Sequence, residues 1–214
     1  ILPKPLAPVE DKTLLEQIMI NFKEHKFEKF LISVNYKKEI IKAYFKDLKG
    51  FNIKFIEEKK YTGTVGSLKY MKSFLTSDFI LTNCDIMLDI NYHDLISYHK
   101  KNKYDLTIVA SKKSFKIPYG ICEISKSMTL KKMIEKPSYD YLVNTGLYVL
   151  KKKLINILPR KNYVDMNDFL ELLKKKNKKI GIFPVEEKSW IDIGQWQEYN
   201  QASKKFKNLF SKKN

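Results

Sequence analysis

The sequence is poor in glycine and cysteine, and it has no long apolar run. Its 214 residues include seven glycines and two cysteines. No apolar stretch approaches the ~20 residues that a membrane-spanning helix requires, which argues against a helical membrane protein. Cys84 and Cys122 are too few for a disulfide framework, and the N-terminus shows no signal-peptide pattern. We therefore expect a soluble protein of the reducing cytoplasm, with no membrane partner.

Arginine is almost absent, and this argues against a nucleic-acid partner. The formal net charge is +17, yet Arg160 is the one arginine among 41 basic residues. Arginine supplies the planar fork that reads base edges and clamps phosphates, whereas scattered lysines are typical of a solvated surface. An RNA-binding module would also need aromatic platforms interleaved with arginine, and none is evident.

Hydrophobic periodicity indicates one α/β domain. A chain of this length can bury roughly 70% of the surface that its unfolded form exposes, enough for a single core. Strands and helices alternate in the first half, which predicts a mostly parallel sheet with helices on both faces, and the second half has shorter connections. We expect a Rossmann-like mixed sheet, flanked by helices, with a small antiparallel extension. The predicted helices are 12–22, 37–45, 67–74, 92–101, 152–158, 167–175 and 195–206, and the predicted strands are 30–34, 53–56, 79–82, 106–110, 121–124, 130–134, 147–150 and 179–185.

Two aspartates suggest a metal site. Asp85 follows an apolar strand almost directly, and Asp192 lies between Ile191 and Ile193, just before Gly194. In open α/β sheets ligands bind outside the carboxyl ends of the strands, where Asp85 is expected. Two converging carboxylates suit Mg²⁺, which takes its remaining ligands from phosphate and water. Each aspartate alone is equally typical of a helix cap or a turn.

A glycine-bearing loop and two lysines are further candidates. Gly63 and Gly66 in TGTVGSL allow close approach of a ligand to the backbone, although an ordinary turn before a helix has the same pattern. Lys4 lies between two prolines, and Lys136 lies in IEKP, so both backbones are stiff enough to aim an ammonium group at a phosphate. Any other lysine is better interpreted as a surface residue. The three histidines, His25, His93 and His99, are expected on helix surfaces or ends.

The segments PKPLAPV, GTVGSL, NCD, YG, EKP, VNTGLYVL and WIDIG follow one another in this order from Pro3 onward. Taken together, they resemble the sugar-1-phosphate nucleotidyltransferase family, and within it the hexose-1-phosphate guanylyltransferase-like branch. The resemblance implies that an NTP, in the first instance GTP, condenses with a sugar 1-phosphate to give an NDP-sugar and pyrophosphate. It also implies a role in bacterial surface glycan synthesis.

The resemblance also assigns roles to residues. It places Lys4, Asp85, Lys136 and Asp192 in catalysis, with Mg²⁺ held by the two aspartates. The implied nucleotide-binding residues are Lys4, Glu58, Gly63, Thr64, Gly66 and Asn83. The implied sugar-phosphate-binding residues are Gly120, Glu135, Lys136, Asn144 and Gly146.

Two departures from the family pattern affect these expectations. The glycine-rich loop that should precede PKPL is absent, since the first glycine is Gly50, and no complete strand comes before PKPL. We therefore expect residues 1–214 to be one catalytic domain that lacks its N-terminal strand and this loop. Cys84 stands where the family usually has glycine. A homo-oligomer and a regulatory domain upstream of Ile1 are both compatible with the resemblance.

Two other functions remain open at this point. A glycosyltransferase of related fold also holds a metal through a strand-end aspartate, but it normally uses a D-x-D pair, and Ile86 and Met87 follow Asp85. An inactive regulatory domain that binds nucleotide or sugar phosphate would keep the same motifs. Pyrophosphate release separates an enzyme from such a binding domain.

Overall fold

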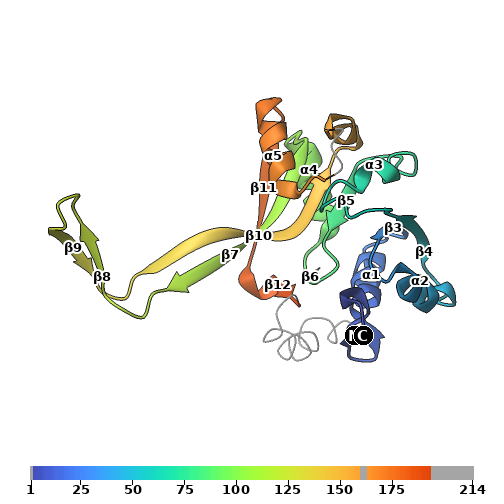
Figure 1. The fold of residues 1–214 in the computed structure, drawn as a ribbon, viewed down its shortest axis with the longest axis horizontal. Coiled ribbons are helices and arrows are strands. Elements are labelled where there is room, and N and C mark those ends of the chain that lie inside the picture. The colour runs from blue at the N-terminus through green and yellow to red at the C-terminus, as the bar shows by residue number, and fades with distance from the viewer. Residues whose placement is uncertain (1, 160–162, 194–214) are drawn as a thin grey trace.

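The computed structural model describes residues 2–159 and 163–193 (Figure 1). The helices are α1 (Leu14–Glu24), α2 (Lys38–Lys46), α3 (Leu68–Met71), α4 (Tyr92–Lys101) and α5 (Met166–Lys175), with 3₁₀-helices η1 (Lys4–Leu6), η2 (Lys152–Ile157) and η3 (Glu187–Ser189). The strands are β1 (Pro8–Val9), β2 (Lys12–Thr13), β3 (Lys29–Val34), β4 (Asn52–Glu57), β5 (Phe79–Thr82), β6 (Ile86–Leu88), β7 (Leu106–Lys116), β8 (Ile121–Ile124), β9 (Leu130–Ile134), β10 (Ser138–Leu150), β11 (Ile180–Val185) and β12 (Trp190–Asp192). None of the described helices combines the length and apolarity needed to cross a bilayer.

The largest sheet has the strand order β11-β7-β10-β5. Strand β11 runs parallel to β7, and β10 runs antiparallel to both of its neighbours. Strands β5, β7 and β11 therefore point in one direction, and only β10 opposes them. This arrangement confirms the predicted mixed, mostly parallel sheet.

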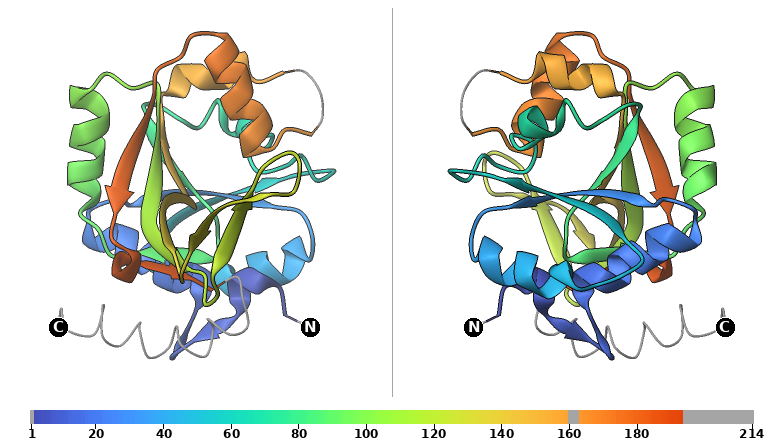
Figure 2. Two further views of the ribbon diagram at one scale, coloured as in Figure 1. Left: turned by 90° about the vertical axis from the view of Figure 1, so that its left-hand side faces the viewer. Right: turned by 90° about the vertical axis from the view of Figure 1, so that its right-hand side faces the viewer.

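Both faces of this sheet are covered, as an α/β fold requires. Successive residues of β10 alternate between two apolar clusters: Leu147 and Val149 join one, and Tyr148 and Leu150 join the other. This is the period of two expected for a strand with both faces buried. Residues of α1 and α4 complete the first cluster, and residues of η2 and α5 complete the second. Figure 2 accordingly shows α4 and α5 on opposite sides of the sheet.

The parallel pair β3–β4 forms a separate two-stranded sheet. A third apolar cluster joins this pair to α1 and α2 through Met19, Val34, Ile41 and Phe45. Leu6 of η1 belongs to the same cluster and is 4% exposed. The packing of Leu6 thus fixes the segment that carries Lys4.

Two short strands that the hydrophobic pattern did not predict, β6 and β12, pair with each other. Buried Asn21 of α1 donates to the carbonyl of Leu88 at 2.9 Å, and the hydroxyl of buried Tyr92 is 3.3 Å from the same carbonyl. The end of β6 is therefore held by two helices. Three residues are too few to show a hydrophobic period, so neither strand could be predicted from the pattern.

Strands β7 and β10 continue beyond the sheet as a two-stranded ribbon, and the β8–β9 hairpin lies at its far end (Figure 1). The predicted strands 106–110 and 147–150 are therefore too short. The predicted helix 152–158 is wrong in type, because residues 152–157 form the 3₁₀-helix η2, and the predicted helix 67–74 is reduced to α3. The predicted helix 195–206 lies outside the described residues.

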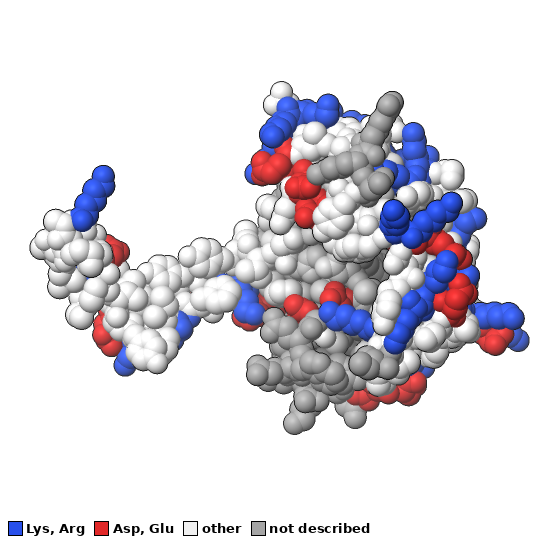
Figure 3. All heavy atoms as spheres, viewed as in Figure 1, with Lys and Arg blue, Asp and Glu red and all other residues white. Residues whose placement is uncertain are grey.

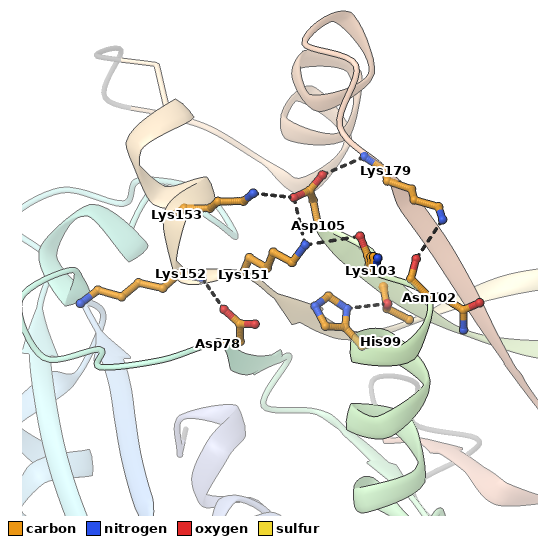
Figure 4. Close-up of polar contacts among 10 residues, drawn as sticks. Asp78, His99, Asn102, Lys103, Asp105, Lys151, Lys152, Lys153 and Lys179 are labelled. Atoms are coloured by element: carbon orange, nitrogen blue, oxygen red, sulfur yellow. Dashed lines mark hydrogen bonds and ion pairs between the residues drawn. The ribbon is translucent and has the colours of Figure 1, made fainter.

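The prediction that His99 lies on a helix surface is also wrong. His99 is 1% exposed, because the face of α4 that carries it packs against β7. Its Nδ1 lies 2.8 Å from Thr107 Oγ1, and its Nε2 has no hydrogen-bond partner among the described residues. Around it, Asp105 accepts from Lys151, Lys153 and the backbone N–H of Lys179 (Figure 4).

We predict that the protein loses stability when the pH falls below 6.5. Burial lowers the pKa of His99 from 6.5; the charges of Lys151 and Lys100 add to this, and Asp78 and Asp105 oppose it only in part. Between the lowered pKa and 6.5 the unfolded chain binds more protons than the folded one, so acid favours unfolding. The free energy of unfolding should fall by at most about 1.4 kcal/mol for each pH unit by which burial lowers the pKa of His99.

Urea unfolding followed by circular dichroism at pH 7.5 and 5.5 measures this loss. The variant His99→Gln should lack the His99 contribution, whereas His93→Gln, at an exposed position of the same helix, should retain it. An identical pH dependence in wild type and His99→Gln would contradict the assignment.

Candidate active site

The structure brings Asp85 and Asp192 together, although they are 107 positions apart in the sequence. Asp192 is the last residue of β12 and lies opposite Ile86 of β6. The backbone N–H of Ile193 donates to the carbonyl oxygen of Asp85 at 2.8 Å. Both aspartates are partly exposed, whereas Ile86, Ile191 and Ile193 beside them are buried. The hydrophobic neighbours therefore position two carboxylates at the surface of the core.

Lys4 reaches the same place from the N-terminal segment. Its Nζ lies 2.6 Å from Asp85 Oδ2. Pro3 precedes Lys4 at the N-cap of η1, and Pro5 follows Lys4 within η1. Burial lowers the pKa of Lys4, but the hydrogen bond to Asp85 and the charges of Asp85 and Asp192 together raise it above 10.5. Lys4 is therefore a permanent cation beside Asp85.

Cys84 lies beside Asp85 and is in contact with solvent. The surrounding protein still removes much of the water around the thiol, and this desolvation together with the charge of Asp85 raises the pKa of Cys84 to about 11, while Lys4 opposes the shift. A thiol next to the carboxylates thus stays neutral at physiological pH and adds no third anionic ligand. Within residues 2–159 and 163–193, no three His, Cys, Asp or Glu side chains form a ready-made metal cluster.

An irregularity in β10 brings Gly146 next to Asn83, which is two residues before Asp85. The pairing of β10 with β7 shifts between Asn144 and Tyr148. At this bulge Gly146 has φ +87°, its N–H donates to Asn144 Oδ1 at 3.1 Å, and its carbonyl accepts from the N–H of Asn83 at 3.0 Å. Asn144 also donates to the hydroxyl of Tyr148 at 2.6 Å. Asn83, which the resemblance places on the nucleotide side, therefore lies against Gly146 of the sugar side.

The glycine-bearing loop is built tightly against the segment before α5. The N–H of Val65 donates to the carbonyl of Val164 at 3.2 Å, and the N–H of Val164 donates to the carbonyl of Thr62 at 2.9 Å. Gly63 has φ +83°, and a Cβ there would lie 2.4 Å from Val164 O. Thr64 is exposed between the buried residues Gly63 and Val65, so its side chain is the part of this loop that a ligand can reach.

Glu58 holds the loop of residues 62–68 in place through hydrogen bonds to Thr62. Its carboxylate accepts from the N–H of Thr62 at 2.9 Å and from the hydroxyl groups of Thr62 and Ser33, and the residue is 8% exposed. Its oxygens are thus already used within the protein, which is typical of a residue that positions a loop. The contribution of Ser33 had no signal in the sequence, because nothing local marks a partner 25 positions away.

The remaining predicted residues lie elsewhere. Gly120, Glu135 and Lys136 are carried by the segments that flank the β8–β9 hairpin, at the end of the ribbon that projects from the body (Figure 1). A Cβ at Gly120 would lie 2.9 Å from Glu135 Oε2, and Lys136 Nζ lies 3.7 Å from Glu135 Oε1. The structure therefore brings these three residues together, but separates them from Asp85 and Asp192.

Comparison with known proteins identifies the family. The family model described as "Nucleotidyl transferase" matches residues 1–208. The chain belongs to this nucleotidyl transferase family. The D-glycero-alpha-D-manno-heptose 1-phosphate guanylyltransferase of Campylobacter jejuni is 30% identical over 92% of this chain and 88% of its own length. The mannose-1-phosphate guanyltransferase of Yarrowia lipolytica is 28% identical over the whole chain, which spans 61% of that protein's length.

Solved structures support the same family and fold. The structure of HddC from Yersinia pseudotuberculosis has a TM-score of 0.74 at 26% identity, over 96% of this chain and 90% of that one. The same protein has also been solved in complex with GMP-PN, with a TM-score of 0.73 to this chain. The nucleotide-diphospho-sugar transferase fold and the family that the motifs suggested are thereby confirmed.

We predict that Gly146→Ala disturbs the site more than its backbone geometry alone explains. A side chain at φ +87° costs roughly 1–2 kcal/mol, and the added Cβ would lie 2.6 Å from Asn83 Nδ2. Gly50→Ala is a matched control, since Gly50 has φ +92° but its Cβ would meet only the end of Lys23, at 3.4 Å. In urea unfolding, Gly146→Ala should lose at least about 1 kcal/mol more than Gly50→Ala. Equal losses would show that Asn83 moves aside freely.

Proposed function

We propose that this chain catalyses the condensation of a nucleoside triphosphate with a sugar 1-phosphate, giving an NDP-sugar and pyrophosphate. The observation that carries the proposal is the meeting of Asp85, Asp192 and Lys4 in a member of the nucleotidyl transferase family. GTP is the first nucleotide to test, because both curated relatives named above are guanylyltransferases. The names of these two relatives contain mannose 1-phosphate and D-glycero-alpha-D-manno-heptose 1-phosphate, so these two sugar phosphates are the first to test.

The donor set fits a magnesium ion. Asp85 and Asp192 offer carboxylate oxygens, and Mg²⁺ is usually held by one or two carboxylates together with substrate phosphates. Lys4 already shows that Asp85 Oδ2 accepts a cation at 2.6 Å. When bound, the ion would neutralise charge on the triphosphate, as metal ions do in phosphoryl transfer.

The chain's own residues would bring two anions into line. An oxygen of the sugar phosphate attacks the α-phosphorus of the triphosphate, the bond from this phosphorus to the bridging oxygen breaks, and pyrophosphate leaves with the electron pair. We assign Lys4 to the nucleotide phosphates and Lys136 to the sugar phosphate, since an ammonium serves as a point charge for phosphate. The loop containing Gly63, Thr64 and Gly66, held in place by Glu58, lies on the nucleotide side with Asn83. Gly120, Glu135, Asn144 and Gly146 are assigned to the sugar side.

The reaction needs no nucleophilic side chain, because positioning and charge neutralisation supply the catalysis. We place this activity in the cytoplasm, where nucleoside triphosphates and sugar phosphates occur, and link it to the synthesis of surface glycans.

The test is a panel of four nucleoside triphosphates against several sugar 1-phosphates, assayed with the full-length natural protein and Mg²⁺ for release of pyrophosphate. Release that depends on both substrates supports a nucleotidyltransferase. Binding of both substrates without release would indicate an inactive regulatory domain. Transfer from a ready-made NDP-sugar would indicate a glycosyltransferase.

We predict that Asp85→Asn and Asp192→Asn each reduce turnover by at least roughly 100-fold, the scale of losing a group that stabilises charge in the transition state. Asp94→Asn, at an exposed position of α4, is the control and should leave turnover unchanged. Steady-state pyrophosphate release measures all three variants. Near-normal turnover in both active-site variants would rule out the assignment of Asp85 and Asp192.

A further inference from the structure

The ribbon that projects from the body has no core of its own. We call residues 114–140 the arm: they comprise the outer ends of β7 and β10 and the β8–β9 hairpin between them (Figure 1). Among the described residues, the hydrogen bonds and ion pairs of the arm join arm residues to one another, as between Ser114 and Asp140 or between Ile117 and Pro137. A two-stranded structure of this kind is at best marginally stable in water.

The arm and its base are nevertheless rich in exposed apolar side chains. More than half of the large apolar residues that the described structure leaves exposed lie here: Phe115, Tyr119, Ile124, Met128, Leu130, Met133, Tyr139, Tyr141 and Leu142. Met128 is 76% exposed and Met133 is 64% exposed. The face shown in Figure 3 is correspondingly poor in charged side chains along much of the arm. Exposed apolar surface of this density is typical of a surface that another protein covers.

The arm also carries three of the five residues assigned to the sugar phosphate. Gly120, Glu135 and Lys136 gather near its end, away from the carboxylates of Asp85 and Asp192 in the body. The body therefore holds the nucleotide residues without the lysine for the sugar phosphate, and the arm holds this lysine without a nucleotide site.

Charge favours contact between an arm and the site of another copy. Within the arm, Lys116, Lys126, Lys131, Lys132 and Lys136 outnumber the three acidic residues Glu123, Glu135 and Asp140. The receiving surface contains the two carboxylates and would also hold a polyphosphate. A basic arm is suited to such a surface, since opposite potentials guide docking.

We propose that two copies of this chain exchange arms, so that each active site combines Asp85, Asp192 and Lys4 of one copy with Lys136 of the other. The inference rests on the proposed function for the role of Lys136. Exchange of identical elements between protomers is a low-cost route to a dimer. It would cover the apolar arm and complete the site in a single step.

Complementation between inactive variants tests the exchange. Asp85→Asn removes a carboxylate assigned to the metal, and Lys136→Met removes the ammonium assigned to the sugar phosphate. Each variant alone should therefore be nearly inactive. Co-expressed in equal amounts, they should recover about a quarter of wild-type activity, because half of the dimers are mixed and each mixed dimer has one intact site. Failure to recover activity while wild type is active would overturn the exchange, since it would show that each arm serves its own chain.

The double variant carrying both substitutions is the control. Co-expressed with wild type, it should lower the activity per wild-type chain about twofold, because half of the wild-type chains enter mixed dimers whose two sites are both defective. In a protein that uses its own arm, wild-type activity would be unaffected. Light scattering must also give twice the mass of a single full-length chain for wild type, and an active monomer would overturn the proposal.

The two cysteines of the chain give a test that needs no activity. Cys84 lies beside Asp85, Cys122 lies on β8 of the arm, and both are exposed. A short bismaleimide at alkaline pH should link Cys84 of one copy to Cys122 of the other, giving a covalent dimer on a denaturing gel and a Cys84–Cys122 peptide by mass spectrometry. Cys84→Ser should abolish this dimer.

A dimer that persists in Cys84→Ser would show arm-to-arm contact without exchange. A link between Cys84 and Cys122 of the same chain would show that the arm folds back onto its own body. Either result overturns the proposal. Wild type that cross-links but releases no pyrophosphate would leave the exchange standing and reject the proposed reaction.

Discussion

The backbone pairing of β6 with β12 determines where the candidate site lies. Two flanking hydrogen bonds extend this three-residue ladder, from Asp89 N–H to Ser189 O at 2.9 Å and from Ile193 N–H to Asp85 O at 2.8 Å. Two carboxylates repel each other, so their charges cannot be what brings them together. The free energy for this approach comes from buried apolar neighbours in one cluster, and Lys4 offsets part of the repulsion.

Strand β10 connects this site to the rest of the molecule in two ways. Its inner half, Leu147–Leu150, is buried on both faces of the sheet, and its outer half is exposed in the ribbon. The bulge at Asn144–Tyr148 lies where the strand changes from one environment to the other, and it is also where Gly146 contacts Asn83. Bulges commonly bend a strand and redirect side chains next to functional sites. The same irregularity thus shapes the site and starts the arm.

The sequence was most informative where local signals were complete. The bounds of β5, α4, β8 and β9 were predicted exactly, and α4 has a clear start at Asn91, whose side chain accepts from the N–H groups of His93 and Asp94. Tertiary contacts decided the rest. The outer part of β7 has no apolar alternation and exists because β10 pairs with it, and His99 is buried because of which face of α4 meets the sheet. The motifs located Asp85, Asp192 and Lys4 as candidates, but only the fold shows that they meet, that Glu58 is used to support a loop, and that Lys136 is remote from them.

A lysine at position 4 has a different consequence for this site than an arginine would have. Lys4 binds Asp85 as a single mobile point charge, whereas arginine would form a two-point, planar contact that is harder to release. In the proposed reaction this ammonium has two successive partners, the carboxylate before a nucleotide arrives and a phosphate oxygen afterwards. In that reaction Asp85 would help to hold the cation and Lys4 would bind the nucleotide phosphates, so a nucleotide that attracts Lys4 would leave Asp85 Oδ2 available to the cation. Under this proposal the Lys4–Asp85 ion pair would couple the binding of cation and nucleotide, and each would favour the other by the same free energy.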